Sequence, residues 1–459
     1  MFLILSSIMA VVTAILLAGG PDVSTSLNTL ASPLILLGYL AHERQRHRTW
    51  ITPLSVFLAL YAILILLPAI LNDYASSSLT LSSVALNRGS AIYLFLLVTA
   101  TTTYYLMDWR RLHTQPKRLG DIWSRHESLR VAHVYYNASL VINVICLMLF
   151  VYLTLARSSA SLITVIMQPT ASFEERVYSG NNWISVPYAV SYAIFATAAA
   201  LSWEGCLSTR QKVISVLVIG MNALIGPSKG ALFAPVLGLL LYRGFVARKR
   251  IGRTVLVLGI FLSAGLPLLF MWRNDISVEN LKKTLLEYNH FFYYTARTST
   301  ELEPSGEYLK QGLHDLLIAP IPRLLWEDKP REYGLTRRVL DYHMYGKDIP
   351  MVRSFTTMGL SEAWLVLGTG GVAISGVWFG LIIYWCGRLM QDRRQYSNVI
   401  LGIILVTSFY PLLRVGFLDL YIYYILLSLV TVWLFDVILV RRHGQRVGSY
   451  ITREPLVVG

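Results

Sequence analysis

The sequence predicts an all-α, polytopic membrane protein with about twelve transmembrane helices. Of its 459 residues, 55% are hydrophobic and only 14% are charged, whereas an ordinary globular domain carries about a quarter charged residues. The mean hydropathy of +0.53 agrees with this composition. A spanning helix needs about 20 apolar residues, so the chain supplies on the order of twelve. These values exclude a secreted, cytosolic or nucleic-acid-binding protein.

Apolar runs bounded by charged residues mark the expected spans in chain order. No Lys or Arg precedes Arg44, so the first run is expected to be a retained span and not a cleaved signal peptide. The second, seventh and eleventh runs are short or interrupted by Pro and Gly, which predicts broken or tilted helices. The approximate positions are 2–18, 27–41, 53–71, 91–107, 136–155, 185–202, 212–226, 231–247, 254–272, 363–387, 399–413 and 420–439.

Positive charge alternates between the connecting segments. With the N-terminus inside, the cytoplasmic segments hold 23 Lys and Arg, against five in the short outside segments. Cytoplasmic loops carry such an excess, so both termini are predicted to be cytoplasmic. The net charge of +14 is therefore attributed to these loops and not to binding of nucleic acid.

One connecting segment is far longer than the rest and is predicted to lie outside. It divides the chain into a membrane domain of about nine spans, the large loop, three last spans and a tail. These parts are 1–272, 273–362, 363–439 and 440–459. Loops of this length are uncommon and are usually functional.

The long loop shows partial helical order in its sequence. Apolar residues recur at helical spacing over 278–292, and a second helical stretch, Tyr308–Ile318, ends before Pro320. The run Tyr288–Tyr294 contains five aromatic residues, a composition suited to a membrane interface or to the faces of sugars. A role in sugar binding is one hypothesis for this run.

Cations are the first candidates for chemistry outside the membrane. Arg323 and Lys329 lie between two prolines, and Lys229 lies in the tight turn Gly226–Gly230 between two spans. Arginine matches phosphate with its planar fork, and lysine supplies a point charge. The alternatives are a solvated loop with internal ion pairs for the first two, and a lysine that extends to the membrane surface for Lys229.

A carboxylate stands where the long loop re-enters the membrane. Glu362 follows Gly359 and precedes Gly368, and it is either functional or a favourable acid at a helix N-terminus. His343 is a candidate general base because its ordinary pKa lies near neutrality; His290 and His314 are weaker candidates of the same kind.

Other polar or small residues in the spans are interpreted as packing elements. Gly376 and Gly380 form a GxxxG pattern that predicts close helix packing, and Asn137, Asn143 and Asn222 are expected to form interhelical hydrogen bonds. The three cysteines are far apart and indicate neither a disulfide framework nor a zinc site. No metal site or cofactor motif is evident.

The loop motifs together resemble those of the Wzy-type polymerases of O-antigen and other oligosaccharide repeat units. The resemblance rests on Pro322-Arg323, Trp326 and Lys329-Pro330, on Gly359, Glu362 and Gly368, and on the turn Ser228-Lys229-Gly230. Two departures are a lysine for the arginine of the turn and Val366 where the family often has Asn.

The resemblance implies a glycosyltransferase of the membrane C type in the bacterial inner membrane. Such an enzyme moves a growing glycan from undecaprenyl diphosphate onto a new lipid-linked repeat on the periplasmic face, for O-antigen, capsule or exopolysaccharide. A flippase and a chain-length regulator are expected partners besides the lipid bilayer. The residues expected to bind the diphosphate are Lys229, Arg273, Arg323, Lys329 and Arg353, and the candidate bases are His343 and Glu362.

Two other functions fit parts of the pattern. An O-antigen ligase shares the topology and the donor but transfers the glycan to the lipid A core. A twelve-span transporter would show two similar halves with a binding site at the midplane. The sequence shows no internal repeat, and its long loop follows the ninth span and not the sixth.

Overall fold

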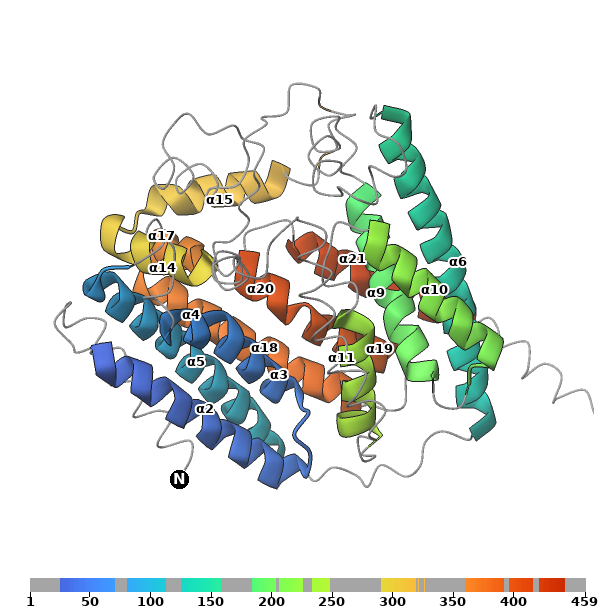
Figure 1. Cartoon of the computed structure of the whole chain (residues 1–459), viewed down its shortest axis with the longest axis horizontal. Coiled ribbons are helices and arrows are strands. Elements are labelled where there is room, and N and C mark those ends of the chain that lie inside the picture. Colours follow the sequence, from blue (N-terminus) through green and yellow to red (C-terminus); the bar gives the residue numbers. More distant parts are fainter. Residues whose placement is uncertain are drawn as a thin grey trace, which may run out of the picture.

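The computed structural model describes a bundle of helices and the turns that join some of them. The described residues are 25–70, 81–112, 125–157, 184–203, 206–225, 233–247, 290–318, 321, 326, 360–391, 396–415 and 421–441. Within these ranges the regular structure is entirely helical (Figure 1). The long helices are α2 (Thr25–His47), α5 (Ser83–Leu112), α6 (Arg125–Arg157), α9 (Ser185–Ser202), α10 (Thr209–Ile225), α18 (Thr369–Gln391) and α21 (Tyr421–Phe435). The shorter ones are α3 (Pro53–Tyr61), α4 (Leu67–Ile70), α11 (Phe233–Leu241), α14 (His290–Glu301), α15 (Gly306–Ile318), α17 (Ser361–Leu367), α19 (Tyr396–Thr407) and α20 (Phe409–Val415), with π-helical turns η1 (Ala62–Leu66), η5 (Tyr242–Val246) and η6 (Asp436–Arg441).

Helices α5 and α18 pack against each other through glycines. A Cβ atom on Gly376 would lie 2.7 Å from Thr99 Cβ, and one on Gly380 would lie 2.6 Å from Thr103 Cβ. Only glycine allows the two backbones to approach this closely, which confirms the prediction that Gly376 and Gly380 are packing residues. The residue that each glycine meets on α5 lies later in the chain for Gly380 than for Gly376, so α5 and α18 run parallel (Figure 1).

Helices α2 and α3 complete the group around α5. Helix α2 runs parallel to α5, and α3 returns in the opposite direction. The contacts that fix these directions join Ser32 to Ser90 and Tyr61 across one small cavity, and Glu43 to Tyr105 and Thr52 by hydrogen bonds at the other end.

Helices α6, α9 and α10 form a second group with polar contacts at its centre. Asn222 Nδ2 donates to Asn143 Oδ1 at 3.0 Å, and Asn143 Nδ2 donates to Ser191 Oγ at 3.3 Å. Interhelical hydrogen bonding is therefore confirmed for Asn143 and Asn222, whereas Asn137 is exposed on α6 and lies outside this network. Helix α10 runs parallel to α6, and α9 runs antiparallel to it. The contacts that fix these directions are Tyr136 with Ser215 and with Phe195, Phe150 with Tyr188, and Asn143 with Asn222 and with Ser191.

The C-terminal helices join the two groups. Tyr396, at the start of α19, shares a hydrogen bond of 3.0 Å with Ser202 of α9, and its ring centroid lies 5.2 Å from that of Tyr135 on α6. The backbone of α19 also passes close to α18, because a Cβ on Gly402 would lie 2.6 Å from Met390. One hydrophobic core therefore runs through both groups.

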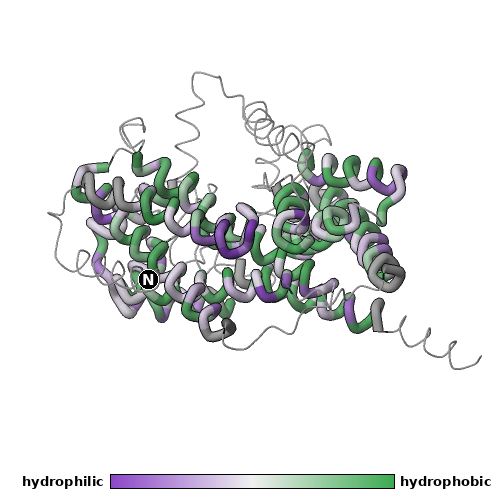
Figure 2. The backbone as a smooth tube through the Cα atoms, turned by 90° about the horizontal axis from the view of Figure 1, so that it is seen from below, coloured by the Kyte–Doolittle hydropathy of each residue, from purple (hydrophilic) through white to green (hydrophobic). Residues whose placement is uncertain are grey.

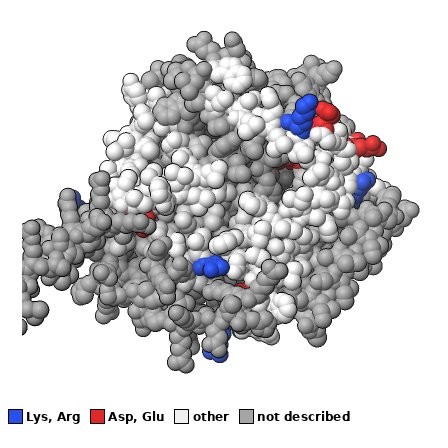
Figure 3. Space-filling model, turned by 180° about the vertical axis from the view of Figure 1, so that it is seen from behind, with Lys and Arg blue, Asp and Glu red and all other residues white. Residues whose placement is uncertain are grey.

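The surface and the helix lengths agree with a membrane protein. Among the described residues, four helical segments are long and apolar enough to cross a bilayer: Pro53–Ile70, Ser83–Trp109, Val131–Leu153 and Thr369–Gln391. Hydrophobic residues dominate the helices (Figure 2), and charged side chains are sparse on the face shown in Figure 3. The all-helical membrane class is thus confirmed. Twelve spans and the orientation stay predictions, because the expected spans 2–18 and 254–272 lie outside the described residues.

The boundaries correct the sequence prediction at three spans. The expected span 363–387 is wrong at its start, because Gly368 adopts a φ of 57° and separates α17 from α18. The second and seventh spans, predicted to be broken or tilted, are not broken: α2 contains Pro33 without a break, and α10 is continuous. A tilt of these helices stays a prediction. The eleventh is interrupted as predicted, between α19 and α20 at Ser408.

Candidate functional site

The candidate site lies where helices of the long loop meet the first turns of α5. Helix α14 crosses α5 so closely that a Cβ on Gly89 would lie 2.6 Å from Ala296 Cβ. Helix α17 packs on α14, and α15 packs on α17 through a hydrogen bond of 2.8 Å from Ser305 N to Leu365 O (Figure 1). The segments 290–318 and 361–367 are therefore folded onto the helix bundle.

A row of buried hydroxyls connects these three helices. Tyr93 Oη of α5 lies 3.0 Å from Thr295 Oγ1 of α14, which lies 3.2 Å from Ser361 Oγ of α17. All three side chains are buried, so their hydroxyls exchange hydrogen bonds with one another in place of water. The row fixes the start of α17 and, with it, the residue that follows Ser361.

That residue is Glu362, which the structure describes, in contrast to the alternative base His343 and the predicted diphosphate-binding cations. It lies in the first turn of α17 and is only 5% exposed. A carboxylate near a helix N-terminus is favoured by the partial positive charge of the unpaired N–H groups. The position agrees with the interpretation of a dipole-stabilised acid, and the role of Glu362 as a proton acceptor stays a prediction.

A cation–π contact links α5 to α17, the helix that carries Glu362. Arg88 Cζ of α5 lies 5.0 Å from the centroid of the Trp364 ring on α17. A guanidinium over an aromatic face is attracted by the ring quadrupole. This contact ties the positive charge of Arg88 to the helix that carries Glu362.

Several polar atoms at this end have no hydrogen-bond partner within the described part of the chain. They are Asn87 Oδ1, Ser90 Oγ, Thr298 Oγ1 and Trp364 Nε1. Leaving a buried polar atom unpaired costs about 1–3 kcal/mol. These atoms lie on α5, α14 and α17, and others of the same kind occur elsewhere in the described bundle, so they do not by themselves indicate a ligand site.

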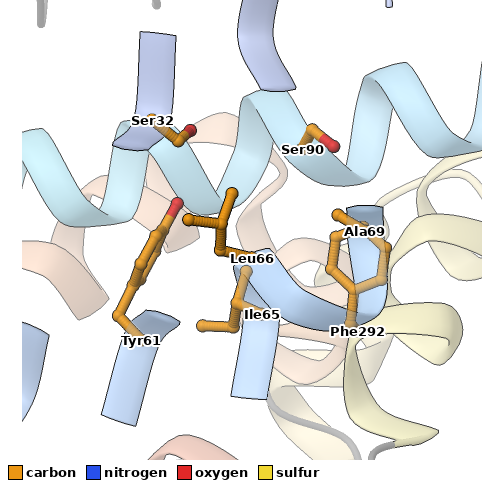
Figure 4. A pocket seen from close by; sticks show the side chains of 7 residues that line it. All are labelled: Ser32, Tyr61, Ile65, Leu66, Ala69, Ser90 and Phe292. Carbon is orange, nitrogen blue, oxygen red and sulfur yellow. The ribbon is translucent and has the colours of Figure 1, made fainter. Parts of the chain in front are cut away.

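A small cavity lies beside Phe292 (Figure 4), whose ring packs on Tyr93 of the hydroxyl row. It has a volume of about 10 Å³ and is lined by Ser32, Tyr61, Ile65, Leu66, Ala69, Ser90 and Phe292. Such a volume accommodates one water molecule and no sugar. It is therefore a packing feature where the segment 53–70 meets α2, α5 and α14, and not a substrate pocket.

The aromatic run of the loop has a different role from the one expected. Phe292, Tyr293 and Tyr294 are at most 1% exposed, so the prediction that they face a membrane interface or a sugar is wrong. Phe292 packs on Tyr93 with ring centroids 5.8 Å apart, and Tyr293 donates to the carbonyl of Pro68 at 3.2 Å. These side chains attach α14 to the bundle.

The other predicted site residues lie outside the described residues. These are Lys229, Arg273, Arg323, Lys329, His343 and Arg353. The structure therefore places Glu362 but leaves the predicted diphosphate-binding cations and the alternative base, His343, as predictions. Among the described residues, no group of three His, Cys, Asp or Glu is arranged to hold a metal ion.

Sequence reasoning missed the residues that support Glu362. Tyr93, Thr295 and Ser361 are single hydroxyls in apolar or loop segments, and Arg88 appeared only as one outside cation. The available signal was the density of Ser and Thr in 295–300, which includes Thr295, Thr298, Ser299 and Thr300 within an otherwise aromatic helix.

A second buried carboxylate, also missed, lies at the opposite end of α5. Glu43 is 1% exposed and accepts hydrogen bonds from Thr52 Oγ1 at 3.0 Å and Tyr105 Oη at 3.2 Å. Burial raises the pKa of Glu43, and Arg46 and the hydroxyl hydrogen bonds oppose this rise without cancelling it. Arg46 also pairs with Asp108 of α5. This cluster fastens α2 and the start of α3 to α5.

No family model, curated protein or solved structure matches the chain.

Proposed function

We propose that this protein is an integral-membrane glycosyltransferase that polymerises oligosaccharide repeats carried on undecaprenyl diphosphate. The observation that carries the proposal is Glu362, a buried carboxylate held by a hydroxyl row on the helix that follows the long loop. In the resembling polymerases, a Glu at this point of the motif follows the same cationic loop segment. The loop motifs and this placement support the same function.

The relative directions of the helices agree with the predicted alternation of the spans, and the charge bias of the loops supplies the side. In the predicted topology α2, α5, α9, α18 and α21 run inward, and α3, α6, α10 and α19 run outward. The parallel pairs α2–α5, α5–α18 and α6–α10 and the antiparallel pairs α2–α3 and α6–α9 agree with that alternation. Under this topology Glu362 lies at the outer end of α5, where lipid-linked repeats are available and nucleotides are not.

The proposed reaction transfers the donor glycan from the lipid diphosphate to a hydroxyl of the acceptor sugar. The acceptor sugar's hydroxyl oxygen attacks the anomeric carbon of the donor, and the bond from that carbon to the diphosphate oxygen breaks. The hydroxyl proton passes to Glu362, which acts as general base. Negative charge develops on the departing undecaprenyl diphosphate, where Arg323, Lys329 and the other predicted cations would stabilise it.

The product separates this function from its two alternatives. Membranes that contain the chain are supplied with lipid-linked repeats, and the glycans are resolved by gel electrophoresis. A polymerase gives a ladder of lipid-linked chains that grows by one repeat. Transfer to an added lipid A core without elongation would show a ligase, and movement of unchanged repeats across the membrane would show a transporter. Either of these results would overturn the proposal.

A further inference from the structure

The inner end of the bundle, by the predicted topology, carries three tryptophans that each lie beside a cation; Trp50 and Trp385 are exposed and Trp203 is half-buried. Arg44 Cζ lies 4.4 Å from the centroid of the Trp50 ring, and Arg388 Cζ lies 5.5 Å from that of Trp385. Lys212 Nζ lies 5.9 Å from the centroid of the Trp203 ring. We call these three pairs the Trp–cation belt.

The belt lies at one end of the molecule although its members are distant in the sequence. The segment 49–53, beside the first pair, is close to the end of α18, since a Cβ on Gly387 would lie 3.9 Å from Pro53. The third pair is linked to the same end through Ser202, which shares a hydrogen bond with Tyr396 at the start of α19. The belt therefore surrounds the end of the bundle opposite to Glu362.

The belt differs from the single Trp–cation contact described at the other end. Trp50 and Trp385 are 54% and 49% exposed, whereas Trp364, which stacks with Arg88, is 5% exposed. Exposed tryptophans gather where a protein crosses the boundary between lipid tails and headgroups. The rings of the belt thus indicate the depth of a headgroup region.

The charge at this end is strongly positive. Of the side chains that the structure describes, seven cations lie here: Arg44, Arg46, Arg48, Arg210, Lys212, Arg243 and Arg388. The described acids at the same end are Glu43, Asp108 and Asp436, and the first two are buried. At the opposite end the described charges are Arg88, Arg297 and Lys310 against Glu301, Glu303, Glu307 and Glu362. Among the described side chains, those of the belt end therefore attract an anionic surface more strongly than those of the other end.

We propose that the Trp–cation belt binds the phosphate groups of anionic phospholipids. The guanidinium groups of Arg44 and Arg388 and the ammonium group of Lys212 carry N–H donors of the kind that bind phosphate oxygens. The indole beneath occupies the level of the glycerol and the first acyl carbons. The partner is thus a phospholipid with a net negative headgroup, such as phosphatidylglycerol. The proposal does not depend on the glycosyltransferase activity.

The test is a lipid titration of the purified full-length protein in detergent, followed by native mass spectrometry. The probes are phosphatidylglycerol and phosphatidylcholine with the same acyl chains. A basic residue near an anionic surface contributes about 1 kcal/mol, or about fivefold in affinity. The variant Arg44→Gln/Lys212→Gln/Arg388→Gln should bind phosphatidylglycerol about a hundredfold more weakly than the wild type. The control, Arg297→Gln/Lys310→Gln at the opposite end, should bind it like the wild type.

A measurement on the wild type alone tests the proposal even if the triple variant does not fold. At 1 M salt the Debye length falls to about 3 Å, so the preference for phosphatidylglycerol should disappear while binding of phosphatidylcholine persists. Equal affinity of the wild type for both lipids at low salt would overturn the proposal. Undiminished binding of phosphatidylglycerol by the folded triple variant would overturn it as well.

Discussion

The proton acceptor is the residue on which the proposed reaction depends most. If Glu362 is the base, Glu362→Gln should lower elongation by about 10²–10⁴-fold, the usual contribution of a general base, without loss of folded protein. Glu303→Gln is the matched control, because Glu303 is an exposed carboxylate in the same part of the loop. His343→Ala should remain active. Turnover is measured as the rate at which lipid-linked repeats are extended in membranes with equal amounts of each variant.

The opposite result would identify His343, and not Glu362, as the general base. Loss of elongation in His343→Ala, with retained donor binding and an active Glu362→Gln, would mean that His343 is the base. Glu362 would then be only a helix N-terminal acid, favourable with the dipole of α17. Full activity of both variants would exclude both residues and leave another acid or histidine of 273–362.

Glu43 is expected to make stability depend on pH. Burial raises its pKa in the folded protein, so between about pH 4.5 and that raised value the folded state holds a proton that the unfolded state releases. The free energy of unfolding should therefore increase as pH falls from 7 toward 5. Glu43→Gln should lack this component, since its amide cannot titrate. Thermal unfolding in detergent over this pH range, compared between the two proteins, measures the effect.

The neighbours of Glu43 define the control for that experiment. Arg46, His47, Asp108, Tyr104 and Tyr105 surround it. Because these residues are present in both proteins, the difference between the two pH profiles reports the loss of the Glu43 carboxylate. Identical profiles would contradict the assignment. Glu43→Ala should lose about 1–3 kcal/mol, as the hydroxyls of Thr52 and Tyr105 lose their acceptor.

At the scale of elements, the contact between α5 and α18 at Gly376 and Gly380 leaves no room for a larger side chain. Gly376→Ala places a methyl group 2.7 Å from Thr99 Cβ and 3.2 Å from the carbonyl oxygen of Leu96, so the helices must separate. Overpacking of this kind costs about 1–3 kcal/mol. Gly370→Ala is the control, because nothing lies within 4 Å of its added Cβ. Thermal unfolding should show a lower midpoint for Gly376→Ala alone, and equal midpoints would contradict the described packing.

The elements also show what the sequence could and could not predict. Helix periodicity located the stretch Tyr308–Ile318, which lies within α15, and the GxxxG pattern identified the glycines of α18 at this contact. Apolarity alone could not tell that Phe292–Tyr294 face protein, because lipid-facing and protein-facing positions are equally apolar in a membrane protein. The break at Gly368 depends on a positive φ, which the surrounding apolar residues do not indicate.

The acid of the candidate site could be predicted from the sequence, but the residues that surround it could not. Glu362 stood out as a carboxylate at the edge of an apolar run. Its support by Tyr93 and Thr295 depends on contacts across 202 and 66 positions in the chain. Such contacts arise from the packing of α5, α14 and α17, and no local pattern encodes them.

For the whole molecule, the orientation of the chain in the membrane is the property to be measured first. Single cysteines at Gln45 and Glu303, both exposed, are introduced after replacement of Cys146, Cys206 and Cys386 by Ala. The charge bias places Glu303 outside and Gln45 inside. A membrane-impermeant maleimide should therefore label position 303 in intact cells and position 45 only after permeabilisation. The reverse pattern would invert the topology and remove Glu362 from the face where lipid-linked repeats are extended.

The most direct test of the central claim uses the purified protein in liposomes with lipid-linked repeats as the only substrate. The donor is activated by its diphosphate, so neither nucleotide sugar nor ATP is supplied. We expect a ladder of products that differ by one repeat, with one undecaprenyl diphosphate released for each repeat joined. Repeats that remain single in the presence of folded protein, with no lipid diphosphate released, would contradict the assignment of this protein as a polymerase.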